Sequence, residues 1–372
     1  MEWIYRQPVK IVFGKPAEDA VAAEIQSRGW SRGLLVTSPS FVRRGLAPQL
    51  AAALGCAVYS AVTPNPEAEQ CNAAAALARE HGAQFVVALG GGSVLDCAKV
   101  AASLALHGGT AEGYMADPKT IPADALPLIA VPTTSGTGSE VTSVAVVSDH
   151  ARGLKMPLAS DAFYPIVAVV DPALTSTVPP YTTACTGFDA LCHAVEAYWG
   201  RGHQPVCDAL AVEAARTILA NIEKATFDGA DIVAREALSR AATTAGLAFA
   251  LPKTSSCHAC SYPLTKLLGI PHGEACALTL DWFIRFNASR GCPRTQELGR
   301  LLGFADADAF ADGIAELKKR CGLRTSLADL DLDEAALSRL ASESMHPNML
   351  NNPVEVTPAD LAELYAELAS KH

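Results

Sequence analysis

Short apolar runs recur through the first half of the chain. Most are rich in β-branched residues and are followed by Gly, Pro, Ser or Asp, which is typical of buried strands in a parallel sheet. Helix-like stretches lie between them, so the pattern predicts an α/β layered domain with an open sheet. The predicted strands are Val9–Phe13, Leu34–Val36, Val58–Val62, Phe85–Leu89, Leu128–Val131 and Ile166–Val170, and the predicted helices are Glu18–Arg28, Leu46–Leu54, Glu67–His81 and Val94–Leu106.

The strand pattern stops after about residue 182. Long Ala- and Leu-rich stretches follow, with apolar positions three and four residues apart, which predicts an all-helical second half. Pro179–Pro180 is the predicted boundary because consecutive prolines stop helices. We therefore expect domains at 1–180 and 181–372, the second with helices in Ala184–Tyr198, Pro205–Asn221, Ile232–Ala250 and Ala335–Ser344.

Composition excludes several classes of protein. Half of the 372 residues are apolar, which argues against disorder. No stretch reaches the roughly 18 apolar residues of a membrane span, and Met1–Lys10 lacks the apolar core of a signal peptide. The net charge of −10 and the lack of a basic block argue against nucleic-acid binding. The 11 scattered cysteines fit reduced thiols, so we expect a cytoplasmic protein.

Two loops that follow predicted strands are suited to binding phosphate. The strand Phe85–Leu89 runs into Gly90-Gly91-Gly92-Ser93 at the start of a helix, where glycines and free N–H groups can approach an anion. The hydroxyl-rich loop Pro132–Glu140 follows another strand. Together they fit a dinucleotide across one sheet edge. The alternative for the glycines is a tight turn only, because their spacing is not the usual dinucleotide fingerprint.

Two further positions bear on the cofactor. Asp96, one turn into the helix after the glycines, can hold a ribose or carboxamide, or can simply complement the helix dipole. The strand end at Ser38 has no acidic residue to repel a 2′-phosphate, and Arg43 and Arg44 follow. This favours NADPH over NADH, unless the arginines are only solvated surface charges.

Four side chains in the second half have the character of metal ligands. Asp189 and His193 are four residues apart, on one face of a predicted helix, and His258 and His272 lie downstream. Three imidazoles and a carboxylate suit Fe²⁺ or Zn²⁺ with a position left for substrate. Each histidine alone is more often structural. Cys257 and Cys260 form a Cys-x-x-Cys without a second half, and we interpret them as packing residues.

These motifs together resemble the iron-containing (group III) alcohol dehydrogenase family. The resemblance spans nearly the whole chain and implies a dinucleotide-binding α/β domain followed by a helical metal-binding domain. The matching stretches are Pro64–Pro66, Gly90–Lys99, Val131–Glu140, Val170–Leu174, Thr186–His193 and Gly269–Gly273.

The resemblance also implies roles for individual residues. The implied metal ligands are Asp189, His193, His258 and His272. The residues expected at the NAD(P)H cofactor, with Ser38 and Ser40 added from the strand end, are Ser38, Ser40, Asn65, Gly91, Gly92, Ser93, Asp96, Thr133, Thr134, Ser139, Lys155 and Leu174.

Two departures from the family pattern concern the cofactor and the substrate. Ser38 replaces the family's common acidic residue, and Tyr262 stands where many members have a proton-relaying histidine. The run from His258 to Thr265 is similar to the phosphonoacetaldehyde reductase branch, which implies reduction of that aldehyde. The proton then reaches the product through Tyr262 or through water and a ribose hydroxyl. Lys253 and Thr254 are the candidate phosphonate-binding residues, although a lysine in such a position is more often a solvated charge at a helix end.

Other functions remain open at this point. They are a general short-chain alcohol or diol dehydrogenase, a glycerol-1-phosphate dehydrogenase- or dehydroquinate synthase-type enzyme on the same fold, and a non-catalytic binder. Intact metal ligands and both cofactor loops argue against the last. We expect a small aldehyde or alcohol as substrate, no nucleic-acid or membrane partner, and keep a homodimer among the candidate assemblies.

Overall fold

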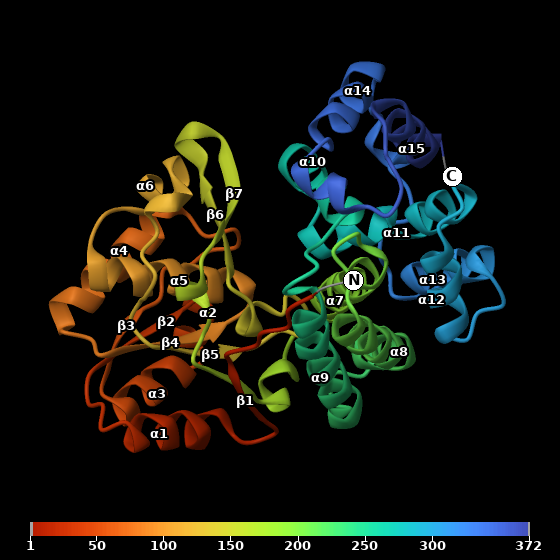
Figure 1. Ribbon diagram of the computed structural model, residues 1–372. Helices are drawn as coiled ribbons and strands as arrows, with labels where there is room; N and C mark the ends of the chain where they lie inside the picture. Colours follow the sequence, from red (N-terminus) through yellow and green to blue (C-terminus); the bar gives the residue numbers. More distant parts are fainter. Residues whose placement is uncertain (1–2, 371–372) are drawn as a thin grey trace. The chain divides into compact units, whose positions relative to one another are not determined.

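The computed structural model describes residues 3–370, which form two compact units (Figure 1). The sheet unit comprises Arg6–Thr134 and Gly138–Thr175. The helical unit comprises residues 3–5, 135–137 and 176–370 of the described chain. The helical unit resumes at Ser176, a few residues before the predicted limit at residue 180. Pro180 begins a long helix, where its missing N–H costs nothing.

The sheet unit contains six parallel strands in the order β1-β8-β5-β4-β2-β3. This confirms the predicted α/β fold with a parallel sheet, and five of the six predicted strands lie within a residue or two of their observed limits. The strands are β1 (Lys10–Phe13), β2 (Gly33–Thr37), β3 (Cys56–Tyr59), β4 (Phe85–Gly90), β5 (Leu128–Pro132) and β8 (Val167–Val170). The helices are α1 (Ala17–Ser27), α2 (Pro39–Arg43), α3 (Leu46–Leu54), α4 (Ala68–His81), α5 (Gly92–His107) and α6 (Ala111–Ala116).

The sheet is covered by helices on both faces, which explains why its strands are apolar throughout. Successive residues of a strand point to opposite faces. In β4, Val86 and Ala88 therefore pack with α4 and α5, whereas Phe85, Val87 and Leu89 pack with α1 and α3. Every residue of β4 is buried as a result.

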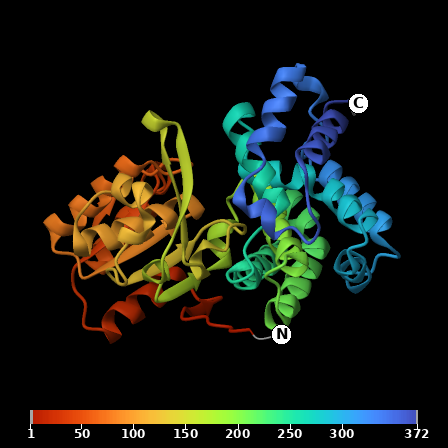
Figure 2. The ribbon, with the colours of Figure 1, turned by 45° about the horizontal axis from the view of Figure 1, so that its top comes forward.

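Two features of the sheet unit differ from the sequence prediction. The strand β3 begins at Cys56 rather than Val58, because Gly55 ends α3 in a left-handed conformation and the chain enters the sheet at once. The antiparallel hairpin of β6 (Val144–Asp149) and β7 (Leu154–Ala159) was not predicted. It extends as a two-stranded ribbon beside the parallel sheet (Figure 2).

The helical unit confirms the second half of the prediction. Its core is formed by apolar faces of α7, α8, α9 and α11 around side chains such as Phe188, Leu191 and Ile218. The helices are α7 (Pro180–Trp199), α8 (Pro205–Phe227), α9 (Ile232–Phe249), α10 (Ser256–Leu268), α11 (His272–Ser289), α12 (Pro293–Leu301), α13 (Ala307–Arg320), α14 (Glu334–Glu343) and α15 (Pro358–Ser370), with a short 3₁₀ turn η7 at Pro347–Asn351.

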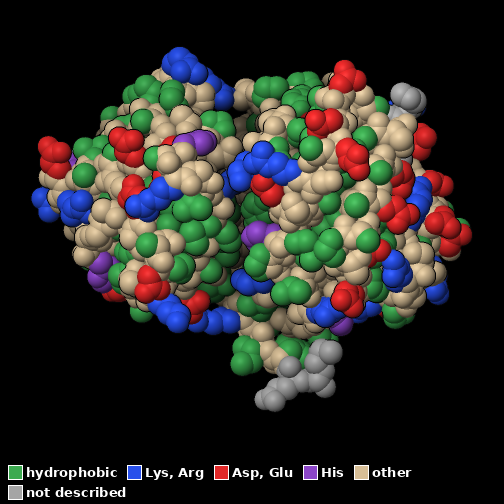
Figure 3. Space-filling model, turned by 90° about the horizontal axis from the view of Figure 1, so that it is seen from above, with side chains coloured by type: hydrophobic (Ala, Val, Ile, Leu, Met, Phe, Trp, Pro, Cys, Tyr) green, Lys and Arg blue, Asp and Glu red, His purple; other side chains and the backbone are tan. Residues whose placement is uncertain are grey.

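On the face of the described residues drawn in Figure 3, acidic and basic side chains are intermixed, without a broad basic patch. Within residues 3–370, none of the helices combines the length and apolar character needed to cross a bilayer.

Candidate cofactor and metal sites

The predicted cofactor residues gather at the carboxyl edge of the sheet. Four neighbouring strands, β8, β5, β4 and β2, end there. Leu174, Thr133, Gly91 and Ser38 each follow one of these strands within a few residues. The strand ends of parallel sheets are where open α/β folds bind ligands. The structure thus brings the predicted residues of the sheet unit to one edge, as the two-loop argument requires.

The two predicted phosphate-binding loops lie side by side. Gly90 pairs with Pro132 across β4 and β5, and the Thr133 N–H donates to the Gly90 carbonyl at 3.1 Å. A Cβ on Gly90 would stand 2.5 Å from the Val94 side chain, and one on Gly91 would stand 3.2 Å from Thr134 Oγ1. Glycine at both positions therefore permits the close approach of strand, helix and second loop. The N-terminus of α5, starting at Gly92, opens beside them.

Asp96 and Ser139 take part in a buried network that includes Lys99. Ser139 Oγ donates to Asp96 Oδ1 at 2.7 Å, and the Val146 N–H donates to Asp96 Oδ2 at 2.9 Å. Lys99 Nζ donates to Ser139 Oγ at 2.8 Å and to the Val144 carbonyl at 2.7 Å. This network holds the second loop and the β6–β7 hairpin against α5. A direct role of Asp96 and Ser139 toward the cofactor stays a prediction.

Other predicted cofactor residues are joined in pairs. Lys155 Nζ donates to Asn65 Oδ1 at 2.8 Å, and the Asn65 N–H donates to Ser93 Oγ at 3.1 Å. Asn65 has a φ of 55°, a left-handed conformation that asparagine tolerates. The hydroxyls of Ser38 and Ser40 are 2.7 Å apart. Lys155, from the hairpin, is therefore connected to the start of α5 through Asn65.

Three helices of the helical unit carry a cluster of potential metal ligands. Asp189 comes from α7, His258 from α10 and His272 from the first turn of α11. Asp189 Oδ1 lies 3.5 Å from His258 Nε2 and 3.7 Å from His272 Nε2. Two donors bound at about 2.1 Å to one cation are separated by roughly 3–3.5 Å. Because these distances exceed normal hydrogen bonds, they fit atoms that share a cation better than atoms that bond to each other.

Neighbouring side chains orient both imidazoles. Glu196, fully buried on α7, contacts His258 Nδ1 and also accepts from the Cys257 N–H at 2.6 Å. Ser261 Oγ lies 3.2 Å from His272 Nδ1. With Nδ1 engaged in each ring, Nε2 is the nitrogen that faces Asp189. Such partners are typical of histidines that bind metals. Glu196 was not predicted from the sequence, although its position seven residues after Asp189 places it on the same side of the helix.

His193 and Cys276 complete the surroundings of the cluster. The His193 ring stacks on His258 at a centroid distance of 4.4 Å. It lies beside the tight group, in which the ligand atoms of Asp189, His258, His272 and Cys276 are all within 4.8 Å of one another. Cys276 was not predicted as a candidate ligand, although its spacing of four from His272 is the same as that from Asp189 to His193.

The described residues meet the requirements of a divalent cation. Asp189 Oδ1, His258 Nε2 and His193 Nδ1 are buried and have no hydrogen-bond partner there, which is costly unless something else binds them. Burial opposes charge on Asp189, but His193, His272 and His258 hold its pKa well below the usual range. Burial lowers the pKa of His193 to about 4. For His258, burial is outweighed by Cys276, Glu196 and Asp189, which raise its pKa, so a cation that binds there displaces a proton. A divalent cation held here supplies Lewis acidity to a carbonyl oxygen.

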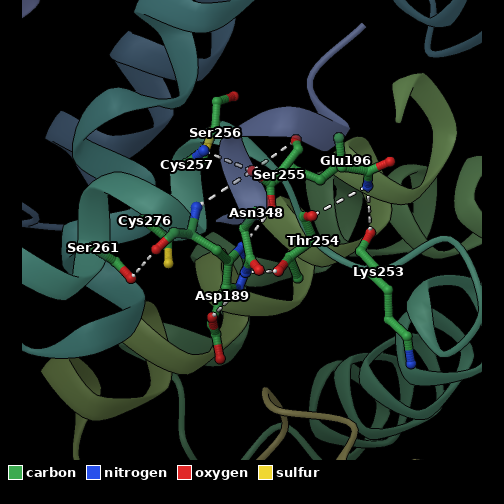
Figure 4. A network of polar contacts seen from close by, with 12 residues as sticks. Asp189, Glu196, Lys253, Thr254, Ser255, Ser256, Cys257, Ser261, Cys276 and Asn348 are labelled. Carbon is green, nitrogen blue, oxygen red and sulfur yellow. Dashed lines mark hydrogen bonds and ion pairs between the residues drawn. The ribbon is translucent and has the colours of Figure 1, made fainter. Parts of the chain in front are cut away.

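Polar side chains next to His258 are candidates for contact with a substrate. Asn348, from η7, donates through Nδ2 to Thr254 Oγ1 at 2.9 Å and also bonds to Tyr262. The Tyr262 ring packs against His346 at 4.5 Å. Lys253 points away from Asp189 in Figure 4, and its Nζ donates to the Ala250 carbonyl at 2.9 Å. Asn348 was missed because it is 90 residues away in sequence from His258, without a local signal.

Comparisons with known proteins agree with this geometry. Residues 8–172 match the family described as iron-containing alcohol dehydrogenase, and residues 183–369 match the family described as Fe-containing alcohol dehydrogenase family, C-terminal. The chain is 38% identical over 369 residues to a probable alcohol dehydrogenase EutG of Salmonella typhimurium, covering 96% of this chain and 93% of that protein. It is 35% identical to the long-chain-alcohol dehydrogenase 1 of Geobacillus thermodenitrificans, covering 95% and 93%.

A solved structure extends the similarity to the whole chain. The crystal structure of sulfoacetaldehyde reductase from Bifidobacterium kashiwanohense in complex with NAD+ is 46% identical, covers 100% of both chains and has a TM-score of 0.97. Fold, metal cluster and sheet edge thus define a metal-dependent, nicotinamide-linked alcohol dehydrogenase or aldehyde reductase. The chain belongs to the iron-containing alcohol dehydrogenase family.

Proposed function

We propose that this enzyme reduces a two-carbon aldehyde whose far end carries a tetrahedral oxyanion. The sequence points to phosphonoacetaldehyde through the run from His258 to Thr265. A relative that is 46% identical over the whole chain acts on sulfoacetaldehyde, which has the same shape with a sulfonate in place of the phosphonate. The observation that carries the proposal is the polar group of Thr254, Tyr262 and Asn348 beside His258.

This group offers hydrogen bonds that an uncharged alkyl chain could not accept. A hydroxyl and an amide can donate to the oxygens of an anionic tail, and hydrogen bonds to charged groups contribute about 1.5–3 kcal/mol each. When a nicotinamide is bound, it supplies the hydride. Burial raises the pKa of Tyr262, so its phenol keeps its proton at neutral pH and can donate it to the product oxygen.

A substrate panel tests the proposal. We would compare phosphonoacetaldehyde and sulfoacetaldehyde with tert-butylacetaldehyde, a neutral compound of nearly the same shape. We expect kcat/KM to be at least about tenfold higher for one or both anionic substrates, which corresponds to about 1.4 kcal/mol. The anionic aldehyde with the higher kcat/KM shows whether the natural substrate carries a phosphonate or a sulfonate. A neutral compound that reacts as well as both would contradict the proposal.

Variants then separate Thr254 from Lys253. Thr254→Val keeps the shape and removes the hydroxyl, and we expect it to raise KM for the anionic substrate while the neutral one is unchanged. Lys253→Ala should raise KM for phosphonoacetaldehyde by roughly tenfold or more if its ammonium binds the tail. Equal losses on charged and neutral substrates would assign Lys253 to the end of α9, where its N–H donates to the Phe249 carbonyl at 2.8 Å.

A general short-chain alcohol or diol dehydrogenase is the second candidate. The position of Lys253 favours it, because Nζ donates to the Ala250 carbonyl and points away from Asp189. Two relatives of this chain, from Salmonella typhimurium and Geobacillus thermodenitrificans, bear names of alcohol dehydrogenases without an anionic substrate. The same substrate panel distinguishes the two candidates, because a general alcohol or diol dehydrogenase would show no preference for a charged tail.

For the cofactor, we propose that NADPH is used at least as well as NADH. The support is Ser38 at the end of β2, with Arg43 and Arg44 close behind it in sequence. Arg44 stacks over the Phe41 ring at 5.2 Å. The relative from Bifidobacterium kashiwanohense binds NAD+, which makes the comparison of both cofactors at equal concentration the direct test. A strong preference for NADH would contradict the proposal.

A further inference from the structure

Cys276 lies within the cluster of metal ligands, and no motif identified above includes it. Its Sγ is 3.9 Å from His272 Nε2 and within 4.8 Å of the ligand atoms of Asp189 and His258. The side chain is fully buried. In Figure 4 it lies on the same side of the network as Ser261 and Asp189.

The packing of α11 directs the thiol to this position. His272 and Cys276 are four residues apart and share one face of the helix. Gly273 lets that face approach α7 closely, because a Cβ there would stand 2.1 Å from the Cys185 carbonyl oxygen and 3.0 Å from Asp189 Cβ. The sulfur is thus held beside Asp189 by the contact between two long helices.

Other buried cysteines nearby face different surroundings. Cys260, two residues after His258, interacts with Tyr365 and Ser344 on the other side of α10. Cys192, beside His193, interacts with Cys257. Among the cysteines of the described chain, Cys276 is the one whose sulfur joins the group of ligand atoms.

We propose that Cys276 binds the catalytic cation as a thiolate in the substrate-free enzyme. The bond forms between Sγ and the cation, and the thiol proton leaves to solvent. The donor set then contains sulfur in addition to nitrogen and oxygen. Because thiolate ligands favour Zn²⁺ over harder cations, this site prefers zinc to Fe²⁺ more strongly than an imidazole and carboxylate set does. The inference holds whichever aldehyde is reduced.

Replacing the metal with cobalt shows directly whether sulfur is a ligand. The metal is removed with a chelator and replaced by Co²⁺, and absorption is recorded for the wild type, Cys276→Ser and the matched control Cys260→Ser. We expect a thiolate-to-cobalt charge-transfer band in the near ultraviolet for the wild type and the control. The band should be lost in Cys276→Ser, while the visible bands of bound cobalt remain. A wild type that binds cobalt without the band, or a band that survives in Cys276→Ser, overturns the proposal.

Two further measurements test the sulfur ligand, and the first of them needs no variant. X-ray absorption of the unaltered zinc-loaded protein should show a sulfur neighbour at about 2.3 Å, and a shell of nitrogen and oxygen alone overturns the proposal even if Cys276→Ser does not fold. With Zn²⁺ and Fe²⁺ offered together without oxygen, Cys276→Ser should shift the bound zinc-to-iron ratio toward iron by about tenfold. An unchanged ratio would show that the sulfur is not a ligand.

Discussion

The carboxyl edge of the sheet, where we expect the cofactor, and the metal cluster are built in different ways. At the edge of the sheet, glycines such as Gly90 and Gly91 remove side chains so that the backbone can approach a ligand. In the helical unit, buried and half-buried side chains converge from α7, α10 and α11, and two of them need a neighbour, Glu196 or Ser261, to present the correct nitrogen. A site built from backbone depends on local sequence, whereas a site built from side chains depends on helix packing.

The largest expected effect is at a ligand. His272→Ala removes one nitrogen from the cluster and leaves the cation poorly held, so we expect reductase activity to be abolished and metal affinity to fall by at least about 100-fold. Metal content by elemental analysis and activity with added metal check this. Circular dichroism should show an intact fold. Full activity with normal metal content would contradict the assignment.

Glu196→Gln tests the orienting partner. The amide keeps an acceptor for the Cys257 N–H but loses the charge that faces His258 Nδ1. We expect metal affinity to fall by about 10- to 100-fold, with cofactor binding unchanged. Competition with a chromogenic chelator measures the first and fluorescence quenching of NADPH the second. Unchanged metal affinity would mean that the carboxylate only secures the start of α10.

Gly90→Ala tests the carboxyl edge of the sheet, where we expect cofactor binding rather than metal binding to be affected. The added methyl meets Val94 at 2.5 Å, so α5 must shift. Overpacking of this kind costs about 1–3 kcal/mol. We expect a higher KM for the cofactor with full metal content, which is the opposite of the result for Glu196→Gln. Loss of metal in this variant would show that the two sites are not separable.

The buried Lys99 predicts a pH effect confined to the sheet unit. Burial lowers its pKa to about 8 from an ordinary 10.5, with Asp96 and Glu140 opposing the shift. Between about pH 8 and 10 the unfolded chain therefore binds more protons, and the free energy of unfolding rises with pH. Lys99→Met should remove this rise. Urea unfolding at several pH values measures it, and equal slopes in both proteins would contradict the prediction.

The smallest effect is expected at the end of β2. Ser38→Asp places a negative charge where we expect the 2′-phosphate and should shift preference toward NADH by charge repulsion. The measurement is the ratio of kcat/KM for the two cofactors. Ser38→Asn, of similar size but neutral, is the control, and an equal shift in both variants would attribute the effect to size.

Sequence alone determined most of the fold. The apolar runs and their turn residues located the parallel strands, and three- and four-residue spacing located the long helices, because both patterns arise from local backbone geometry. The glycine loop at Gly90 was found for the same reason. The hairpin of β6 and β7 was not predicted, because the sequence of its two strands resembles a loop between two more apolar strand patterns.

Some residues of the metal cluster were likewise predicted from the sequence, and others were located only by the tertiary structure. Asp189 and His193 were predicted from their spacing within one helix, and His258 and His272 as downstream imidazoles that complete a ligand set, which the family resemblance also implied. The tertiary structure decided that the Cys276 sulfur lies near the potential ligand atoms of Asp189, His258 and His272, that Glu196 faces His258 and that Asn348 bonds to Thr254. The physical reason is that contacts between helices depend on how closely their surfaces approach, as at Gly273, and no periodicity along one segment encodes that distance.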